Sequence, residues 1–143
     1  MTDSITTRVS PAEPERGDLA RFRDKKILVA EDNKINSQLI QLQLQSFGLD
    51  SDMVNDGLEV LSAVEKKHYD LVLMDWQMPR MSGLEATRKI REQGGHKDIV
   101  IIAVTANAMS GDVDACLEAG MNDYISKPVK RDELSIKLAK WLA

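Results

Sequence analysis

Short apolar runs alternate with longer segments of helical periodicity along most of this chain. Five such runs occur, and each is followed by a stretch whose apolar side chains recur every three or four residues. Parallel strands need a long crossover connection, and a helix usually provides it. The alternation therefore predicts an α/β fold, in which five parallel strands form one doubly wound sheet with helices on both faces.

Glycine, proline and capping residues set the expected bounds of these elements. The strands are expected over Lys26–Glu31, Ser51–Val54, Tyr69–Asp75, Asp98–Val104 and Asp123–Ser126. The helices are expected over 34–47, 56–67 and 82–93, then across Met109–Leu117 and across Leu134–Leu142. The fourth strand is almost continuously apolar, which is typical of a strand covered on both faces.

The helical segments show apolar faces that should pack on the sheet. The first helix carries two adjacent stripes, Ile35-Leu39-Leu42 and Ile40-Leu44-Phe47. The fourth face contains Met109, Val113, Cys116 and Leu117, and the last contains Leu134, Leu138, Trp141 and Leu142. Because the single cysteine falls on such a face, we expect it to serve packing.

The chain has 143 residues, which suits one domain after a polar leader. Residues 1–23 are rich in Ser, Thr, Pro and charge, so they are expected to form a flexible tail or interdomain linker. A short helical turn at Leu19–Phe22 that packs on the domain is an alternative for part of this segment. The folded domain is expected over 24–143.

Composition narrows the classes of function. The net charge of -4 and the lack of a compact Lys/Arg cluster argue against nucleic-acid binding. No apolar stretch approaches the roughly 20 residues that span a bilayer, and the N-terminus lacks the apolar core of a signal peptide. One cysteine rules out an internal disulfide framework. We therefore expect a cytoplasmic protein without direct membrane insertion.

Polar side chains follow the apolar runs at their carboxyl ends. Glu31 and Asp32 follow the first run, Asp75 ends the third, Thr105 follows the fourth, and Lys127 follows the fifth. In an open parallel sheet the carboxyl ends of the strands share one edge, and ligands bind there. The sequence therefore predicts that these five side chains surround one pocket.

The chemistry of this set points to phosphoryl transfer. Clustered carboxylates need a cation or raised pKa values, and hard oxygen ligands suit Mg²⁺. A carboxylate can also attack phosphorus and form an aspartyl phosphate, for which Asp75 is the candidate. Lys127 supplies a positive charge, and Thr105 supplies a hydroxyl, for the phosphoryl oxygens. These residues predict a magnesium-dependent phosphoryl acceptor.

From about Lys26 to Leu142 the chain resembles the receiver (phosphoacceptor) domain of two-component response regulators. The segments that carry the resemblance are Val29–Asn33, Leu73–Pro79, Met81–Gly83, Val104–Ala108 and Asp123–Pro128. They occur in the order and at the spacing of that family. Glu31-Asp32-Asn33 with Asn36, and the segment Gly120–Tyr124, resemble in particular the receivers of hybrid sensor histidine kinases.

The resemblance implies a flavodoxin-like (βα)5 sheet with strand order 2-1-3-4-5. It also implies that Asp75 accepts a phosphoryl group from a phosphohistidine. The cofactor would be Mg²⁺, with Mn²⁺ as an alternative ion. Its implied ligands are Asp32, Asp75 and the backbone carbonyl of Gln77, with Glu31 acting through a bound water.

The resemblance further implies how the signal is made. Lys127 would contact the phosphoryl group, and its peptide bond to Pro128 would be cis. Thr105 would move toward the phosphoryl group while Tyr124 turns inward as the switch aromatic. The surface formed by the fourth helix, fifth strand and fifth helix would change with them.

The partners implied are a histidine kinase, a histidine phosphotransfer protein, or both. The domain would be a monomer or a weak phosphorylation-dependent dimer. It would catalyse its own phosphorylation and dephosphorylation without being a conventional enzyme. It is expected to be the receiver part of a hybrid sensor histidine kinase, tethered to a membrane-bound sensor, and a stand-alone single-domain response regulator is the alternative.

Two other classes of protein are alternatives to this interpretation. A phosphatase or phosphotransferase with an aspartyl-phosphate intermediate usually carries a second acid two residues after the nucleophile, where this chain has Gln77. A flavodoxin-like nucleotide or flavin binder needs a phosphate cradle after the first strand. The corresponding segment, Glu31–Lys34, is acidic and lacks glycine.

Overall fold

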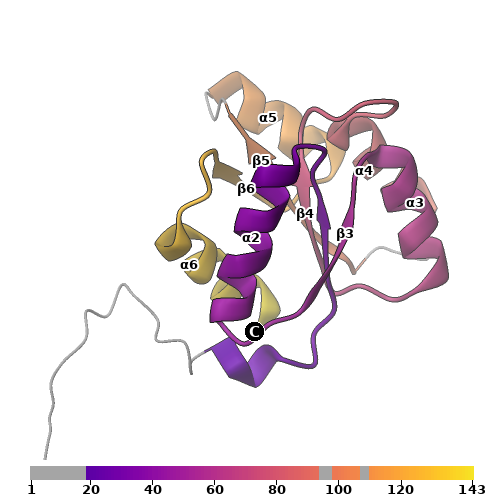
Figure 1. Cartoon of the computed structure of the whole chain (residues 1–143). Coiled ribbons are helices and arrows are strands. Elements are labelled where there is room, and N and C mark those ends of the chain that lie inside the picture. The colour runs from indigo at the N-terminus through magenta and orange to yellow at the C-terminus, as the bar shows by residue number, and fades with distance from the viewer. Residues whose placement is uncertain (1–18, 94–97, 107–109) are drawn as a thin grey trace, which may run out of the picture.

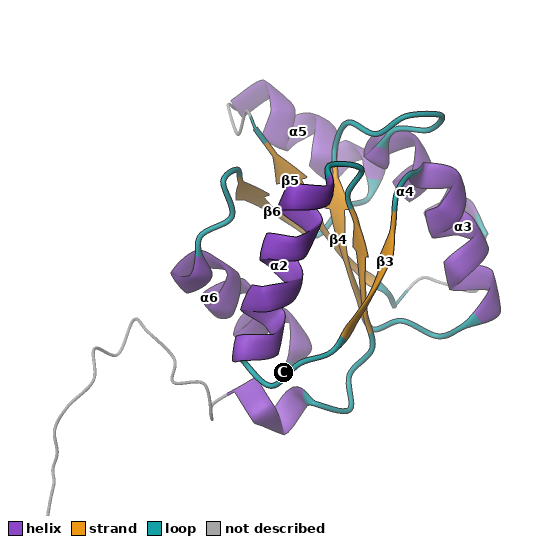
Figure 2. Ribbon diagram, in the orientation of Figure 1, coloured by secondary structure: helices purple, strands orange, loops and turns teal. Residues whose placement is uncertain are grey.

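The structure, a computed structural model, describes residues 19–93, 98–106 and 110–143. Its centre is a five-stranded sheet in the order β3-β2-β4-β5-β6, in which every neighbouring pair is parallel (Figure 2). The strands are β2 (Ile27–Ala30), β3 (Ser51–Val54), β4 (Leu71–Asp75), β5 (Val100–Thr105) and β6 (Asp123–Ser126). Since β2 is the first strand of the sheet along the chain, the expected order 2-1-3-4-5 is confirmed.

The helices form a layer on each face of the sheet, with α2 and α6 on one side and α3, α4 and α5 on the other (Figure 1). Their bounds are α2 (Lys34–Ser46), α3 (Gly57–Lys66), α4 (Gly83–Glu92), α5 (Ser110–Ala119) and α6 (Arg131–Leu142). Two of them begin with the expected side-chain caps, Asp56 and Ser82, and Asn33 caps α2 in the same way. The alternation of strands and helices that the sequence predicted is therefore confirmed.

Each face of the sheet has its own hydrophobic core. On one side Ile40 and Leu44 of α2 and Leu134 and Leu138 of α6 pack against alternate side chains of the strands. On the other side the alternate residues of the strands pack against α3, α4 and α5, and Cys116 of α5 is part of this core. Because both faces are covered, β2 and β4 are buried along their whole length.

One apolar stripe of α2 faces outward, which the sequence pattern left open. Ile40 and Leu44 are buried, whereas Ile35 and Leu42 are 76% and 64% exposed, and Leu39 is also exposed. A helix lying on a sheet buries only one stripe, so the second remains on the surface.

The fourth apolar face is likewise narrower than the sequence suggested. On α5, Cys116 is buried but its neighbour Leu117 is 52% exposed, so Leu117 is not part of the inward face. Val113 is half-buried. Met109, which we assigned to the same face, lies outside the described residues.

The folded part of the chain begins earlier than residue 24. Leu19 and Phe22 are buried in the core that lies under α2 and α6, and the single turn η1 (Ala20–Phe22) joins them. The amide of Lys25 donates to the carbonyl of Phe22 over 2.8 Å, which leads the chain into β2. The packed residues thus include part of the expected tail.

Within the described ranges, no helix has the length and apolarity that a bilayer span requires.

Candidate functional site

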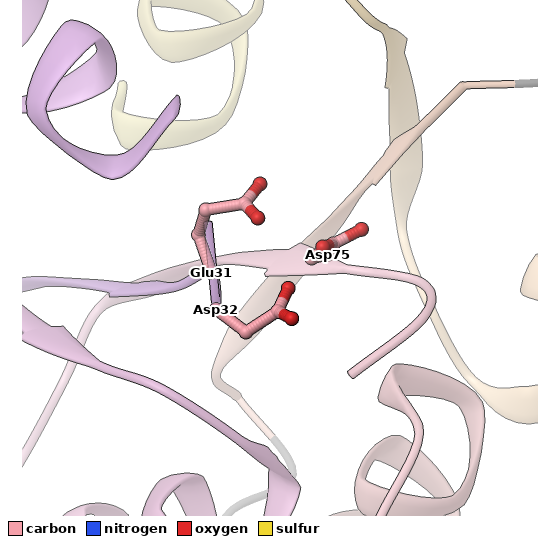
Figure 3. Close-up of side chains that lie close together, drawn as sticks. All are labelled: Glu31, Asp32 and Asp75. Carbon is pink, nitrogen blue, oxygen red and sulfur yellow. The ribbon is translucent and has the colours of Figure 1, made fainter. Parts of the chain in front are cut away.

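The acidic side chains lie where two neighbouring parallel strands end. In the register of β2 and β4, Ala30 is paired with Met74, so the next residues, Glu31 and Asp75, are side by side. Asp32 follows at the start of the loop to α2. Figure 3 shows that the three carboxylates share the space beyond the ends of the two strands. The sheet register therefore builds the cluster that the sequence predicted.

The three carboxylates are close enough to bind one ion. One oxygen from each of Glu31, Asp32 and Asp75 lies within 4.8 Å of the others. Glu31 and Asp75 are 2% and 4% exposed, whereas Asp32 is exposed to solvent. Such a group of like charges is unfavourable on its own, because each buried charge loses water and repels its neighbours.

The pKa of Glu31 is raised above its usual value of 4.5. Burial is the main cause, and the charge of Asp75 adds to it. The backbone N–H of Asn33 donates to Oε2 of Glu31 over 3.0 Å and partly offsets the rise. The other oxygen of Glu31, Oε1, is buried and accepts no hydrogen bond of good geometry. A nearby cation would compensate the buried charge at this oxygen.

Lys127 is the cation that the fold already supplies. Its Nζ lies 3.1 Å from Oδ1 of Asp75 and 3.2 Å from Oε1 of Glu31, the second contact being an ion pair rather than an aligned hydrogen bond. Burial alone would lower the pKa of Lys127, but Asp75 and then Glu31 outweigh it and the pKa is raised. The peptide bond from Lys127 to Pro128 is cis.

The remaining predicted residues take two different positions. Thr105 ends β5, is buried, and lines the same cleft as the acids and Lys127. Gln77 also lines the cleft, and its backbone N–H points toward Oδ1 of Asp75 at 3.4 Å. The cleft is open and has a volume of about 600 Å³. Tyr124 lies away from it, half-buried on β6, with Nζ of Lys137 5.1 Å from the centre of its ring.

The donor set fits a hard divalent cation. Three carboxylates converge, and Gln77 lines the same cleft beside Asp75. Mg²⁺ prefers such oxygen ligands and keeps some of its water, which the open cleft admits. The cluster of Glu31, Asp32 and Asp75 is therefore consistent with a magnesium site.

Three other residues contribute to the site in ways that the sequence did not indicate. Asn33 orients Glu31 through its N–H and caps α2 by accepting from the N–H of Asn36 over 3.0 Å. Asn directly before a helical pattern is a preferred N-cap, which would have indicated the capping role. Trp76 forms part of the cleft wall. Arg80, in the loop after Asp75, forms an ion pair that no local pattern indicated.

Residues 27–139 match the family of response regulator receiver domains. Hybrid signal transduction histidine kinase B of Dictyostelium discoideum is 39% identical over 127 residues, which cover 81% of this chain and 6% of that protein. The chain thus corresponds to a small part of the length of this relative.

Two solved structures share the fold at high similarity. The receiver domain of sensor histidine kinase PA1611 from Pseudomonas aeruginosa has a TM-score of 0.77 and 44% identity, covering 82% of this chain and 97% of that one. That structure contains a magnesium ion coordinated in its active site cleft. The receiver domain of Ssk1, solved with the histidine phosphotransfer protein Ypd1 of Saccharomyces cerevisiae, has a TM-score of 0.78 and 29% identity, covering 82% and 88% of the chains.

Proposed function

Because this chain belongs to the response regulator receiver domain family, we propose that Asp75 accepts a phosphoryl group from a phosphohistidine on a partner protein. The observation that carries the proposal is the contact of Lys127 with Asp75 beside two further acids. A carboxylate between a fixed ammonium group and a cation site can receive a phosphoryl group whose oxygens both charges stabilise.

The transfer needs few groups of the protein. A carboxylate oxygen of Asp75 forms a bond to phosphorus, and the bond from phosphorus to the imidazole nitrogen of the donor breaks with its electron pair on that nitrogen. Lys127 and the hydroxyl of Thr105 hold two of the phosphoryl oxygens. Bound Mg²⁺ or Mn²⁺ would neutralise negative charge on Asp75 and the phosphoryl group. Asp32, Asp75 and Gln77 would hold this ion, with Glu31 acting through a water.

The product remains on the domain, so the chain acts in signalling and not in the turnover of a small molecule. Gln77 occupies the position where an aspartyl-phosphate phosphatase would need a second acid. The domain would therefore catalyse its own phosphorylation and dephosphorylation. We place it in the cytoplasm, as a monomer or a weak phosphorylation-dependent dimer that does not bind nucleic acid.

The exposed stripe of α2 favours a helical partner at the mouth of the cleft. Ile35, Leu39 and Leu42 lie on the helix that starts directly after the acidic loop, and Leu39 and Pro128 line a small hollow beside Lys127. The partner we propose is a histidine phosphotransfer protein, since the receiver domain of Ssk1 forms a complex with the phosphotransfer protein Ypd1. An amphipathic helix on this stripe would bring a phosphohistidine over Asp75.

The parent protein we propose is a hybrid sensor histidine kinase. Relatives of that kind contain a segment similar to this chain as a small part of their length. A stand-alone single-domain response regulator is the alternative. Phosphotransfer profiles against histidine kinases and histidine phosphotransfer proteins would separate the two, because a relay receiver exchanges its phosphoryl group fastest with a phosphotransfer protein.

Phosphorylation would also change the shape of the domain. The new charge on Asp75 attracts the hydroxyl of Thr105, and Tyr124 on the neighbouring strand turns into the space that Thr105 leaves. The register pairs Thr105 with Ser126 and Ala103 with Tyr124, so Thr105 and Tyr124 lie on neighbouring strands, two register positions apart. The face formed by α5, β6 and α6 would carry the change outward.

The decisive experiment is phosphorylation by acetyl phosphate with Mg²⁺, measured by intact-protein mass spectrometry. The parent protein should gain one phosphoryl group, and Asp75→Asn should gain none. Asp50→Asn, an exposed change outside the cleft, should behave like the parent. Uptake by Asp75→Asn at the level of the parent would refute the assignment.

A further inference from the structure

The loop between β4 and α4 contains a turn that a non-glycine residue rarely forms. Arg80 has a φ of 66°, in the left-handed region that favours glycine. The N–H of Met81 donates to the carbonyl of Pro79 over 2.7 Å, which closes a three-residue turn around Arg80. Backbone strain of this kind persists only where surrounding contacts maintain it. The contacts of Arg80 should therefore show what this turn is for.

The side chain of Arg80 is held by a buried carboxylate on another loop. Its Nε donates to Oδ2 of Asp56 over 2.8 Å, and Nη2 lies 2.6 Å from the same oxygen. Asp56 is only 4% exposed, and its Oδ1 accepts from the N–H of Glu59 as the cap of α3. Burial alone would raise the pKa of Asp56, but the Glu59 N–H and Arg80 outweigh it, so the pKa is lowered.

The backbone makes a second connection between the same two loops. The N–H of Gly57 donates to the carbonyl of Met81 over 3.2 Å. A β-carbon on Gly57 would lie 2.6 Å from that carbonyl oxygen, so the loops approach as closely as glycine allows. The loop after Asp75 is thus fixed to the start of α3 by a charged pair and a backbone hydrogen bond.

The fixed loop is the one that carries Gln77. Its first residue, Trp76, donates its N–H to the carbonyl of Val104 over 3.1 Å, and Gly83 closes the loop by donating to the carbonyl of Trp76 over 2.8 Å. These bonds hold the two ends of the loop. Gln77 lies between them, and the ion pair of Arg80 restrains the intervening backbone from outside the cleft.

We propose that Arg80 is a positioning residue for the divalent cation. Its ion pair with Asp56 keeps the loop in the conformation in which the backbone carbonyl of Gln77 meets the ion held by Asp32 and Asp75. This inference rests on the proposed function, since it concerns the same cation site. Arg80 itself touches neither the ion nor the phosphoryl group and acts through the backbone of its loop.

The sign of the effect separates positioning from electrostatics. Arg80 is a cation on the loop that lines a cation site, so removing its charge should strengthen Mg²⁺ binding if charge alone matters. Losing the restraint on Gln77 should weaken Mg²⁺ binding instead. The two accounts therefore predict opposite changes for the same substitution.

The test is the dissociation constant of Mg²⁺, measured by isothermal titration calorimetry on the whole chain. Arg80→Ala should raise it on the order of tenfold, as the loss of outer groups that orient metal ligands commonly does. Arg88→Ala removes the same charge from the exposed side of α4 and should leave binding unchanged or slightly tighter. Binding by folded Arg80→Ala that equals or exceeds that of the parent would overturn the proposal.

Two further variants keep the test valid if Arg80→Ala folds poorly. Arg80→Gly allows positive φ without the ion pair, and Asp56→Asn keeps an acceptor for the cap of α3. Arg80→Gly should weaken Mg²⁺ binding, which loss of charge alone would strengthen, and the double variant Arg80→Ala/Asp56→Asn should weaken it no more than the larger single change. Additive losses would refute a shared role for the pair.

The outcome is also distinguishable from a failure of the proposed function. A parent protein that neither binds Mg²⁺ nor accepts a phosphoryl group at Asp75 would overturn the function itself. A parent that does both, together with Arg80 variants that bind Mg²⁺ as tightly, would overturn only the role of Arg80.

Discussion

Nζ of Lys127 lies 3.1 Å from Oδ1 of Asp75, although β5 separates the two strands that lead to these residues. Lys127 follows β6, and its backbone N–H donates to the carbonyl of Thr105 at the end of β5 over 2.8 Å. The contact between the two side chains therefore depends on the correct parallel pairing of three strands. Chemistry at Asp75 is tied in this way to the integrity of the sheet.

Removal of Lys127 should destabilise the fold through repulsion between the buried carboxylates of Glu31 and Asp75. In Lys127→Ala, Glu31 and Asp75 lose their shared cation while both remain almost fully buried. We expect the free energy of unfolding, measured by urea denaturation in EDTA, to fall by about 1–3 kcal/mol. Added Mg²⁺ should recover part of that loss, because it binds the folded cluster. Lys130→Ala is the control, and equal stability of the Lys127 variant with and without Mg²⁺ would contradict the prediction.

Asp123 should make the domain sensitive to acid. Its Oδ1 accepts from Nζ of Lys137 over 2.7 Å, and its Oδ2 accepts from Nε1 of Trp141 over 2.8 Å. Burial alone would raise the pKa of Asp123, but these donors, with the N–H of Tyr124, outweigh it and lower the pKa below the usual 3.8. The stabilisation is therefore present above pH 3.8 and lost as the pH falls through the lowered pKa.

The measurement is a series of urea denaturations from about pH 6 to about pH 3. Asp123→Asn should be less stable than the parent at the upper end and should lose less stability on acidification. Asp98→Asn, at an exposed position, is the matched control. Parallel stability curves for the parent and Asp123→Asn would rule out this source of acid sensitivity.

Gly83→Ala should disturb the site without touching a reactive group. A β-carbon at Gly83 would overlap the carbonyl oxygen of Asp75 and lie 2.9 Å from Cγ of Met74. We expect destabilisation of about 1–3 kcal/mol from overpacking, although alanine is normally the better helix former. Phosphorylation of Asp75 by acetyl phosphate should slow as its backbone shifts. Ser82→Ala, which removes only the cap of α4, should lose stability but keep the phosphorylation rate. Slower phosphorylation of Ser82→Ala than of Gly83→Ala would contradict a role for the close contact between Gly83 and the backbone of Asp75.

Leu19→Ala should show that the residues before β2 belong to the fold. Leu19 is fully buried in the core under α2 and α6, so we expect a loss of about 2–4 kcal/mol in the free energy of unfolding. Arg23→Ala, at an exposed position four residues later, should change stability little. A chain that starts at Asp24 should show a loss at least as large as Leu19→Ala. If that truncated chain were as stable as the parent, the folded domain would begin where the polar leader was expected to end.

The sequence predicted the sheet and the acids because both follow from local patterns. Apolar runs that end in Glu31, Asp75 and Thr105 mark the strands, and a parallel sheet brings such ends to one edge whatever the loop lengths. The assignment of Lys127 likewise needed only its place after the last strand. These predicted positions did not depend on how the helices pack, and the structure brings the side chains together at one edge of the sheet.

Other features depend on contacts between segments that are distant in the sequence. The choice of Ile40 over Ile35 as the buried side of α2 depends on the rotation of the helix on the sheet, and both stripes have suitable spacing. Leu19 stands in a polar segment of the sequence. Its burial depends on the hydrophobic core under α2 and α6, which the local sequence does not reveal. The turn at Arg80 has no glycine to signal it, since its conformation is maintained by Asp56 from another loop.

The docked turn at Leu19 and Phe22 lies at the opposite end of the sheet from the acidic loop (Figure 1). A sensor or kinase joined ahead of this turn would be anchored at the rear of the domain, leaving the reactive mouth facing away from the attachment. A partner protein could then reach the cleft without contacting the joined domain. A reporter fused at that end should accordingly spare phosphotransfer.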